Sequence, residues 1–362
     1  IEAAFQTVKY YFGTTPSQYT SVRLGEFPNP NVGWEKAKKL NLGADLSFFN
    51  QLNISVDYFK ENREGIFLQR KSIPMYVGLS TKPWVNIGKM RNSGIDASLE
   101  YHQPLGKDLH LTVRGNFTYA RNRIMDQDEP DYAYTYMNRS GQMQYQKFGL
   151  VAVGLFQDQE DIDSWAKQSF GEVKPGDIKY LDLNGDGIVD NYDTKPIGYS
   201  DIPEIVYGFG FSLQWKAFDL SAFFQGVAHV NFSTLTDQTQ AFVGRNLKES
   251  SVFADLYGNT WTPENPGAKY PRMTTGAIDN NNQLSTFWMA NGRYLRLKNL
   301  ELGYTLPKRI ANKIAMQNLR VYLSGVNLFT FSPFKLWDPD LQTGATNYPN
   351  NRIINLGLTI GF

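Results

Sequence analysis

The sequence predicts an all-β fold, a transmembrane antiparallel β-barrel with long loops on one side of the membrane. Three observations predict it. Apolar residues recur with a period of two, the connections are alternately short and long, and aromatic residues stand at the short-turn ends of the alternating stretches.

Composition narrows the classes of protein further. Among the 362 residues, Lys and Arg total 36 and Asp and Glu total 35, so no bulk positive field exists to attract nucleic acid. Cysteine is absent, which excludes disulfides, thiolate catalysis and cysteine-bound zinc. No run of about 18 apolar residues occurs, so the sequence has no transmembrane helix. An aromatic content of 14% at a mean hydropathy of −0.41 suits an aromatic-rich β-protein.

The period of two is clearest in one hairpin. From Ile205 to Trp215 every second residue is apolar, and the pattern resumes after Lys216 and Ala217. Alternation on both arms of so short a turn indicates a β-hairpin. The same reasoning predicts about ten strands along the chain, at 3–12, 40–48, 52–58, 95–101, 109–119, 205–215, 218–224, 300–306, 319–323 and 354–362.

The connections alternate in length. Short turns are expected at 49–51, 103–107, 216–217 and 307–318, and long loops at 13–38, 61–92, 121–203, 231–291 and 330–351. A soluble barrel or sandwich has short loops at both ends, whereas an outer-membrane barrel has short periplasmic turns and long extracellular loops. The alternation therefore favours the outer-membrane barrel.

Five aromatic residues share the apolar face at the short-turn ends of their strands: Phe48, Tyr101, Trp215, Tyr304 and Phe362. Amphipathic rings suit the headgroup boundary of a membrane. The apolar face is therefore expected to contact outer-membrane lipid, and the face rich in Gly, Asn, Thr, Ser and Arg to line a wet lumen. Only a closed barrel satisfies every strand edge in hydrocarbon.

The loops are extensive for a barrel of ten strands, and the chain begins without an initiator methionine or a signal sequence. We therefore expect residues 1–362 to be the C-terminal part of a larger barrel, with the earlier strands outside this sequence. Loop 121–203 is its largest extracellular loop.

A family pattern runs in consistent order from about Trp34 to Phe362. Its segments are Trp-Glu-Lys at 34–36, Gly-Lys-Met-Arg-Asn-Ser-Gly at 88–94, Gly-Asp-Ile-Lys-Tyr at 176–180, Tyr-Gly-Phe at 207–209, Trp-Thr-Pro-Glu-Asn-Pro at 261–266, Arg-Tyr-Leu-Arg-Leu-Lys-Asn-Leu at 293–300 and Gly-Val-Asn-Leu-Phe at 325–329. These segments resemble the SusC/RagA-type TonB-dependent transporters.

The resemblance implies a 22-stranded barrel plugged by an N-terminal domain, in the outer membrane of a Gram-negative bacterium. It implies import of a nutrient, a glycan or an oligopeptide, with energy from TonB and a SusD-type surface lipoprotein as a lid. The plug, the TonB-contacting segment and the early strands are not in this sequence, so the transport mechanism rests on the resemblance alone.

One motif predicts a metal site. Residues 182–193 follow the calcium-loop pattern, with oxygen ligands at positions 1, 3 and 5 and glycine at position 6. The expected ligands of a structural Ca²⁺, with Mg²⁺ as the alternative, are Asp182, Asn184, Asp186, the carbonyl of Ile188, Asp190 and Asp193. A solvated Asn-Gly/Asp-Gly turn without metal is the competing interpretation.

Aromatic residues in the long loops are candidates for substrate contact, because exposed rings stack on sugars or receive peptides. They are Tyr132, Tyr134, Tyr136, Trp288 and Trp337. Packing of the loops against each other is the alternative role. The sequence has no GxSxG motif, Walker loop or dinucleotide fingerprint, and we expect no enzyme activity.

Two functions from other classes remain open at this point. A barrel closed by ten strands could be a stand-alone outer-membrane channel, and a soluble calcium-stabilised β-protein could bind glycans. The outward stripe of Phe, Leu and Trp argues against the soluble protein.

Overall fold

A computed structural model describes residues 4–12, 17–77, 81–236, 239, 253–274, 276–314, 316–344 and 347–362. The described residues form two compact units. Unit 1 contains 1–41, 59–93 and 121–144, and unit 2 contains 42–58, 94–120 and 145–362. No helix in these described ranges is long and apolar enough to cross a membrane.

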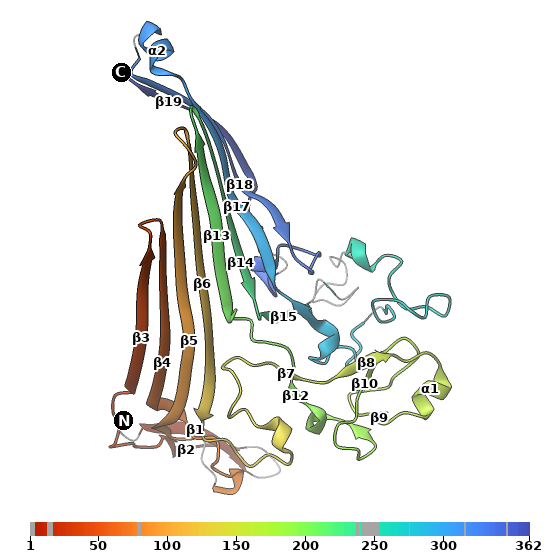
Figure 1. Cartoon of the computed structure of the whole chain (residues 1–362). Helices are drawn as coiled ribbons and strands as arrows, with labels where there is room; N and C mark the ends of the chain where they lie inside the picture. Colours follow the sequence, from red (N-terminus) through yellow and green to blue (C-terminus); the bar gives the residue numbers. More distant parts are fainter. Residues whose placement is uncertain are drawn as a thin grey trace. The chain divides into compact units, whose positions relative to one another are not determined.

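The main element is a nine-stranded sheet in the order β19-β18-β17-β14-β13-β6-β5-β4-β3 (Figure 1). All pairings from β6 to β19 are antiparallel. The strands are β3 (Lys36–Phe48), β4 (Leu52–Gln69), β5 (Trp84–Pro104), β6 (Leu109–Asp126), β13 (Ile205–Trp215), β14 (Phe218–Ala228), β17 (Tyr294–Thr305), β18 (Asn318–Phe331) and β19 (Ile353–Gly361).

The leading strand does not join this sheet. Strand β1 (Ala4–Phe12) pairs with β2 (Ser17–Glu26) in a two-stranded sheet of its own. Among the described residues the main sheet therefore has nine strands, where the sequence predicts about ten. The partner strand begins five residues after β1 ends, and so short a loop closes at little entropic cost. Strand β1 therefore pairs with its neighbour in the sequence and not with the main sheet.

Side chains in register across six strands of unit 2 show that the sheet has two chemically different faces. One row is entirely leucine, and the next row on the opposite face is polar. The leucine row is Leu111, Leu213, Leu220, Leu302, Leu323 and Leu356; the polar row is Thr112, Ser212, Ser221, Glu301, Ser324 and Asn355. Successive side chains of a strand point to opposite faces of the sheet, so the period of two in the sequence produces one apolar face and one polar face.

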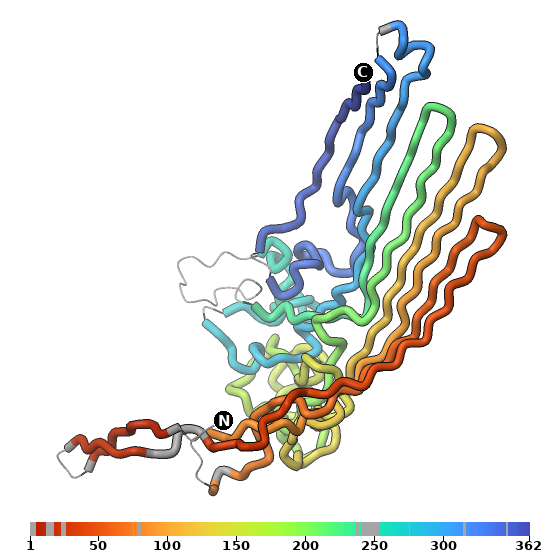
Figure 2. Tube along the Cα trace, turned by 90° about the vertical axis from the view of Figure 1, so that its left-hand side faces the viewer, coloured from red at the N-terminus to blue at the C-terminus, as the bar shows by residue number. Residues whose placement is uncertain are grey.

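The four short turns lie at the same end of the sheet (Figures 1 and 2). Phe49, Asn50 and Lys216 have φ of 54°, 55° and 54°, the left-handed backbone that tight hairpin turns require. The fourth turn contains α2 (Lys308–Ala311) and a 3₁₀ turn, η6 (Asn312–Ile314). At this end Phe218 contacts Tyr304 with ring centroids 4.7 Å apart and stacks on Trp215 at 6.3 Å, and the membrane girdle stays a prediction.

The largest loop is folded rather than irregular. Short strands pair within it as β7 with β12, β8 with β10 and β9 with β11. They are β7 (Phe148–Gly149), β8 (Ala152–Leu155), β9 (Lys167–Gln168), β10 (Ile178–Tyr180), β11 (Ile188–Val189) and β12 (Lys195–Pro196), with helix α1 (Gln159–Asp163) between β8 and β9.

The remaining elements are short. Strand β15 (Asn231–Ser233) pairs with β16 (Met289–Asn291), and the other 3₁₀ turns are η1 (Met75–Val77), η2 (Thr135–Met137), η3 (Asn191–Asp193), η4 (Ala254–Leu256), η5 (Thr286–Trp288) and η7 (Pro339–Leu341).

Candidate functional site

The loops of unit 2 share a hydrophobic core. Its buried members come from two distant parts of the chain: Leu150, Leu155, Ile178, Tyr180 and Val189 from the largest loop, and Leu256, Trp261, Tyr270 and Trp288 from the loop after β15. Burial of this apolar surface holds the two loops together. The long loops are therefore a packed structure that can present a defined surface.

A buried ion pair joins the same two loops. The carboxylate of Asp177 is fully buried, and the Nε of Arg272 lies 2.8 Å from its Oδ1. The amide of Asn281 donates to the same oxygen at 2.9 Å, and the backbone N–H of Lys174 donates to Oδ2 at 2.8 Å. A buried carboxylate needs such partners, because its desolvation is costly. No separate sequence pattern predicts this pair, although Asp177 lies in one of the family-like segments.

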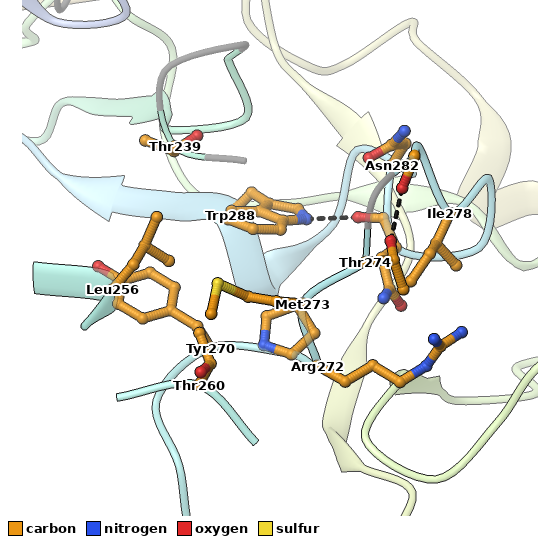
Figure 3. Close-up of a pocket in the computed structure, with 13 residues that line it drawn as sticks. Thr239, Leu256, Thr260, Tyr270, Arg272, Met273, Thr274, Ile278, Asn282 and Trp288 are labelled. Carbon is orange, nitrogen blue, oxygen red and sulfur yellow. Dashed lines mark hydrogen bonds between the residues drawn. The ribbon is translucent and has the colours of Figure 1, made fainter. Parts of the chain in front are cut away.

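A small cavity of about 50 Å³ lies beside this core (Figure 3). Trp288 lines it and donates its indole N–H to the carbonyl of Asn281 at 2.8 Å. The other lining residues include Leu256, Tyr270, Met273 and Ile278. At this volume the cavity holds water-sized molecules and not a nutrient.

A larger cavity of about 560 Å³, here called the aromatic cavity, shares Trp288 and Tyr270 with the small one. Its volume lies in the range of roughly 300–1,000 Å³ that is typical of ligand pockets. The lining residues come from five stretches of chain: Thr234 and Thr239; Phe253, Ala254 and Asp255; Lys269 and Tyr270; Phe287 to Asn291; and Pro333 to Leu336.

Charged groups stand at one side of the aromatic cavity. Asp255 accepts hydrogen bonds from Lys269 at 2.5 Å and from the hydroxyl of Tyr270 at 2.6 Å. The hydrogen bond from Lys269, with that from Tyr270, holds the pKa of Asp255 below its usual value. Asp255 is therefore a carboxylate at neutral pH, and it fixes Lys269 in place.

The structure places the five aromatic candidates in two groups. Tyr132, Tyr134 and Tyr136 belong to unit 1, where the rings of Tyr134 and Tyr136 stack with centroids 5.3 Å apart. Trp288 and Trp337 belong to unit 2. Trp288 is only 3% exposed, and Trp337 packs on Phe334 and Phe253 at 4.7 and 6.0 Å. The substrate role of these residues stays a prediction.

Residues 182–193 form a closed loop whose oxygens accept its own backbone N–H groups. Asp182 accepts from Gly185 and Gly187 at 2.7 and 2.8 Å, and these glycines have φ of 76° and 85°. The fully buried Asp193 accepts from Leu183 and Asp190 at 2.7 and 2.8 Å. Asn184 and Asp186 accept from Asp186 and Ile188, both at 2.9 Å.

The carboxylates of this loop are not gathered around one point. Across the part of the chain that the structure describes, no group of three or more His, Cys, Asp or Glu side chains has the arrangement of a metal site. The loop nevertheless offers only oxygen donors, the type that Ca²⁺ prefers.

The polar face of the sheet carries a further charged cluster. Arg320 lies 2.5 Å from both Asp219 and Glu301, which come from neighbouring strands. Its guanidinium stacks over the ring of Tyr322 at 4.9 Å. Such a cluster suits a water-lined wall and could not face lipid.

Comparison with known proteins agrees with the two-faced sheet. The family model described as TonB dependent receptor-like, beta-barrel, matches residues 4–328. TonB-dependent receptor P3 of Formosa agariphila is 30% identical over 95% of this chain and 36% of its own length. TonB-dependent receptor SusC of Bacteroides thetaiotaomicron is 26% identical over 98% of this chain and 34% of its own length.

A solved structure described as the RagAB peptide transporter superposes with a TM-score of 0.71 at 22% identity, over 100% of this chain and 38% of that one. The chain thus spans little more than a third of the length of the relatives it matches. The soluble glycan-binding protein that the sequence left open does not agree with these findings. The chain belongs to the TonB-dependent receptor-like β-barrel family of Gram-negative outer-membrane proteins.

Proposed function

We propose that this chain forms part of the wall and the extracellular loops of a TonB-dependent importer that takes a nutrient across the outer membrane. The observation that carries the proposal is the two-faced sheet, with a leucine row on one face and a polar row on the other, in a chain of this family. The apolar face contacts lipid, and the polar face lines the path of the nutrient.

The nutrient is a glycan or an oligopeptide, and a SusD-type lipoprotein covers the loops. Support comes from the folded loops of unit 2, whose shared core gives a lid a fixed surface to meet. TonB supplies the energy for this import, as the resemblance to the SusC/RagA-type transporters implies.

The test uses the whole protein in its own bacterium. A tagged full-length receptor is purified from outer membranes, and co-purifying lipoproteins are identified by mass spectrometry. Uptake of candidate nutrients is then compared in cells with and without TonB. A co-purifying lipoprotein and TonB-dependent uptake are expected. Uptake that persists without TonB would indicate a stand-alone outer-membrane channel instead.

A structural Ca²⁺ in loop 182–193 is a second proposal. Asp182, Asn184, Asp186, the carbonyl of Ile188, Asp190 and Asp193 would hold it, with Mg²⁺ as the alternative ion. Two features support it: Gly187 has the left-handed backbone at position 6, and Asp193 at position 12 already folds back onto the N-terminal part of the loop. The ion would offset two of the four negative charges of these aspartates and order the loop.

Removal of the ion should loosen residues 170–200. Limited proteolysis with and without a chelator measures this, and faster cleavage inside the segment is expected after chelation. Asp186→Ala should give the same faster cleavage without chelator, because it removes one ligand, whereas Asp163→Ala in α1 serves as the control. Cleavage that is the same with and without chelator would sink the metal proposal.

A further inference from the structure

Two groups of packed rings contribute to the lining of the aromatic cavity. In the first, the lining residue Phe334 contacts Trp337 edge to face, with centroids 4.7 Å apart, and Trp337 contacts the lining residue Phe253 at 6.0 Å. In the second, Phe287 contacts Trp288 edge to face at 5.0 Å. Met289, Ala290 and Leu336 also line the cavity.

Most polar groups in the lining are already engaged by the protein. Thr234 donates to the carbonyl of Trp288 at 2.9 Å, and Thr239 donates to the carbonyl of Thr236 at 3.0 Å. Asp255 is held by Lys269 and Tyr270. Asn291 accepts from the backbone N–H of Arg293 at 3.1 Å.

This arrangement discriminates between classes of ligand. A sugar can stack one face of its ring on an aromatic side chain, but it carries a hydroxyl on nearly every ring carbon, and most polar lining groups of the cavity are already bonded to the protein. Polar groups buried without partners oppose binding. A large apolar side chain gives up no hydrogen bonds there, and the transfer of its apolar surface out of water favours binding.

The charges beside the cavity suit a peptide. Lys335 lines the cavity and is exposed, and the ammonium of Lys269 stands next to Tyr270, 4.9 Å from its ring centroid. Main-chain carbonyls and a terminal carboxylate of a bound peptide can accept hydrogen bonds from such lysines. The cavity thus combines an apolar lining with the exposed Lys335 and the Asp255–Lys269 ion pair.

We propose that the aromatic cavity is a subsite for an oligopeptide, which places a bulky apolar side chain against the lining residues Phe334 and Phe287. The inference rests on the proposed import function and names the substrate class for it. Phe287, Phe334 and Met289 contact the side chain, and Lys335 contacts the peptide backbone or its carboxylate.

The experiment uses the full-length receptor in detergent with any lipoprotein that co-purifies. Three probes are titrated by calorimetry: the pentapeptide Gly-Ser-Phe-Ser-Gly, the same peptide with Ala in place of Phe, and maltopentaose. The Phe peptide should bind at least about tenfold more tightly than the Ala peptide, because only its ring fills the apolar space.

Two variants localise the binding. Ala254→Trp puts an indole into the cavity from an exposed lining position and should weaken the Phe peptide at least about tenfold. Ala277→Trp is the matched control, since Ala277 is exposed on the same loops and does not line the cavity. Phe287→Ala should reduce the preference for Phe over Ala. Heat-modified mobility in gels confirms that each variant has folded.

Equal affinities for the two peptides would overturn the inference, as would unchanged binding in Ala254→Trp. Binding of maltopentaose that Ala254→Trp abolishes would make the cavity a carbohydrate site and would also overturn it. These outcomes leave the importer function in place, because TonB-dependent uptake is measured separately. Loss of TonB dependence with intact discrimination between the peptides would instead overturn the importer.

Discussion

At the scale of single residues, Gly176 shows how closely the long loops of unit 2 approach each other. Its φ is +90°, and a Cβ at this position would lie 2.4 Å from the Trp261 ring and 2.9 Å from the Cβ of Arg272. Only glycine combines this backbone with so little space. Gly176 directly precedes Asp177, so its backbone also places the buried ion pair.

Gly176→Ala should therefore destabilise the loop core. The left-handed backbone and the overlap with Trp261 together predict that the free energy of unfolding falls by about 2–4 kcal/mol. Differential scanning fluorimetry and tryptophan emission would detect it as a lower melting temperature of the loops. Gly258→Ala is a control, because Gly258 also has positive φ, +73°, but has no atom within 4 Å of the added Cβ. Equal effects of the two substitutions would contradict the steric explanation.

Asp128 in unit 1 supports a second prediction at this scale. It accepts from the backbone N–H groups of Lys71 and Ser72 at 2.7 and 3.1 Å, and from Arg70 at 3.1 Å. Burial raises the pKa of Asp128, but hydrogen bonds from Ser72, Arg70 and Lys71 outweigh it and lower the pKa to about 2.

Because the folded pKa lies below the unfolded value of 3.8, the stabilisation from Asp128 is complete well above pH 4 and is lost as the pH falls toward 2. Asp128→Asn should loosen residues 70–72 at pH 7 and have little effect near pH 2. Hydrogen exchange of these amides, corrected for the intrinsic rate, measures both. An equal effect at the two pH values would show that charge is not the cause.

At the scale of elements, one arginine fixes the loop after β18 to the wall. Arg296 is 2% exposed, and its guanidinium lies 2.5 Å from both Asp338 and Asp340. Its Nε also donates to Thr330 at 2.9 Å, and Asn350 donates to both aspartates. The segment that carries Phe334 and Trp337 to the aromatic cavity is therefore attached to β17.

Arg296→Met should release this segment while leaving the strands paired. Removal of the arginine leaves the carboxylates of Asp338 and Asp340 unpaired, and the free energy of unfolding should fall by about 3 kcal/mol. This is the low end of the usual cost of breaking a buried ion pair, because the side chain of Asp340 keeps 31% exposure. Limited proteolysis should show new cleavage within 332–344. Arg293→Met is the control, since Arg293 is exposed; new cleavage there as well would point to a general effect of losing charge.

Glycines opposite aromatic residues give the strands a further local interaction. Tyr322 is in register with Gly357, and a Cβ on that glycine would lie 2.1 Å from the Tyr322 ring. Phe223 lies in the same way over Gly210, its cross-strand partner. An aromatic ring that covers a glycine shields backbone which would otherwise be exposed and helps to fix the register.

At the scale of the whole molecule, the free-energy cost of exposing the apolar face of the sheet depends on whether water or lipid surrounds it. In water, the exposed rings and leucines would form an apolar patch far larger than soluble monomers show. In a bilayer, lipid covers the same apolar face. The backbone N–H and C=O groups at the strand edges must then form hydrogen bonds with further strands.

Phe211→Arg tests this assignment of faces. Phe211 is on the apolar face, 38% exposed and four residues from the girdle residue Trp215. A charge there should cost about 2–4 kcal/mol and lower the amount of folded, heat-modifiable receptor in outer membranes. Ser212→Arg, on the opposite face, should have little effect. A larger loss for Ser212→Arg would mean that the faces are reversed.

The sequence predicted the strands well where lipid imposes a strict period of two. It predicted their ends less well. Strand β5 runs for 21 residues and β4 for 18, because both continue past the apolar band with polar residues such as Glu61 and Arg63 that carry no alternation signal. The fold of the 121–203 loop was also missed, because its core depends on partners such as Trp261 and Trp288, about 100 residues away.

The sequence by itself determined the face of every wall strand, the short turns and the family resemblance, because each is a local pattern of a few residues. The tertiary structure decided what local patterns cannot encode. It paired β1 with β2 apart from the main sheet, buried Asp177 against Arg272, and enclosed the aromatic cavity between five separate stretches of chain. Burial and enclosure arise when distant segments exclude water together, and no single segment carries that information.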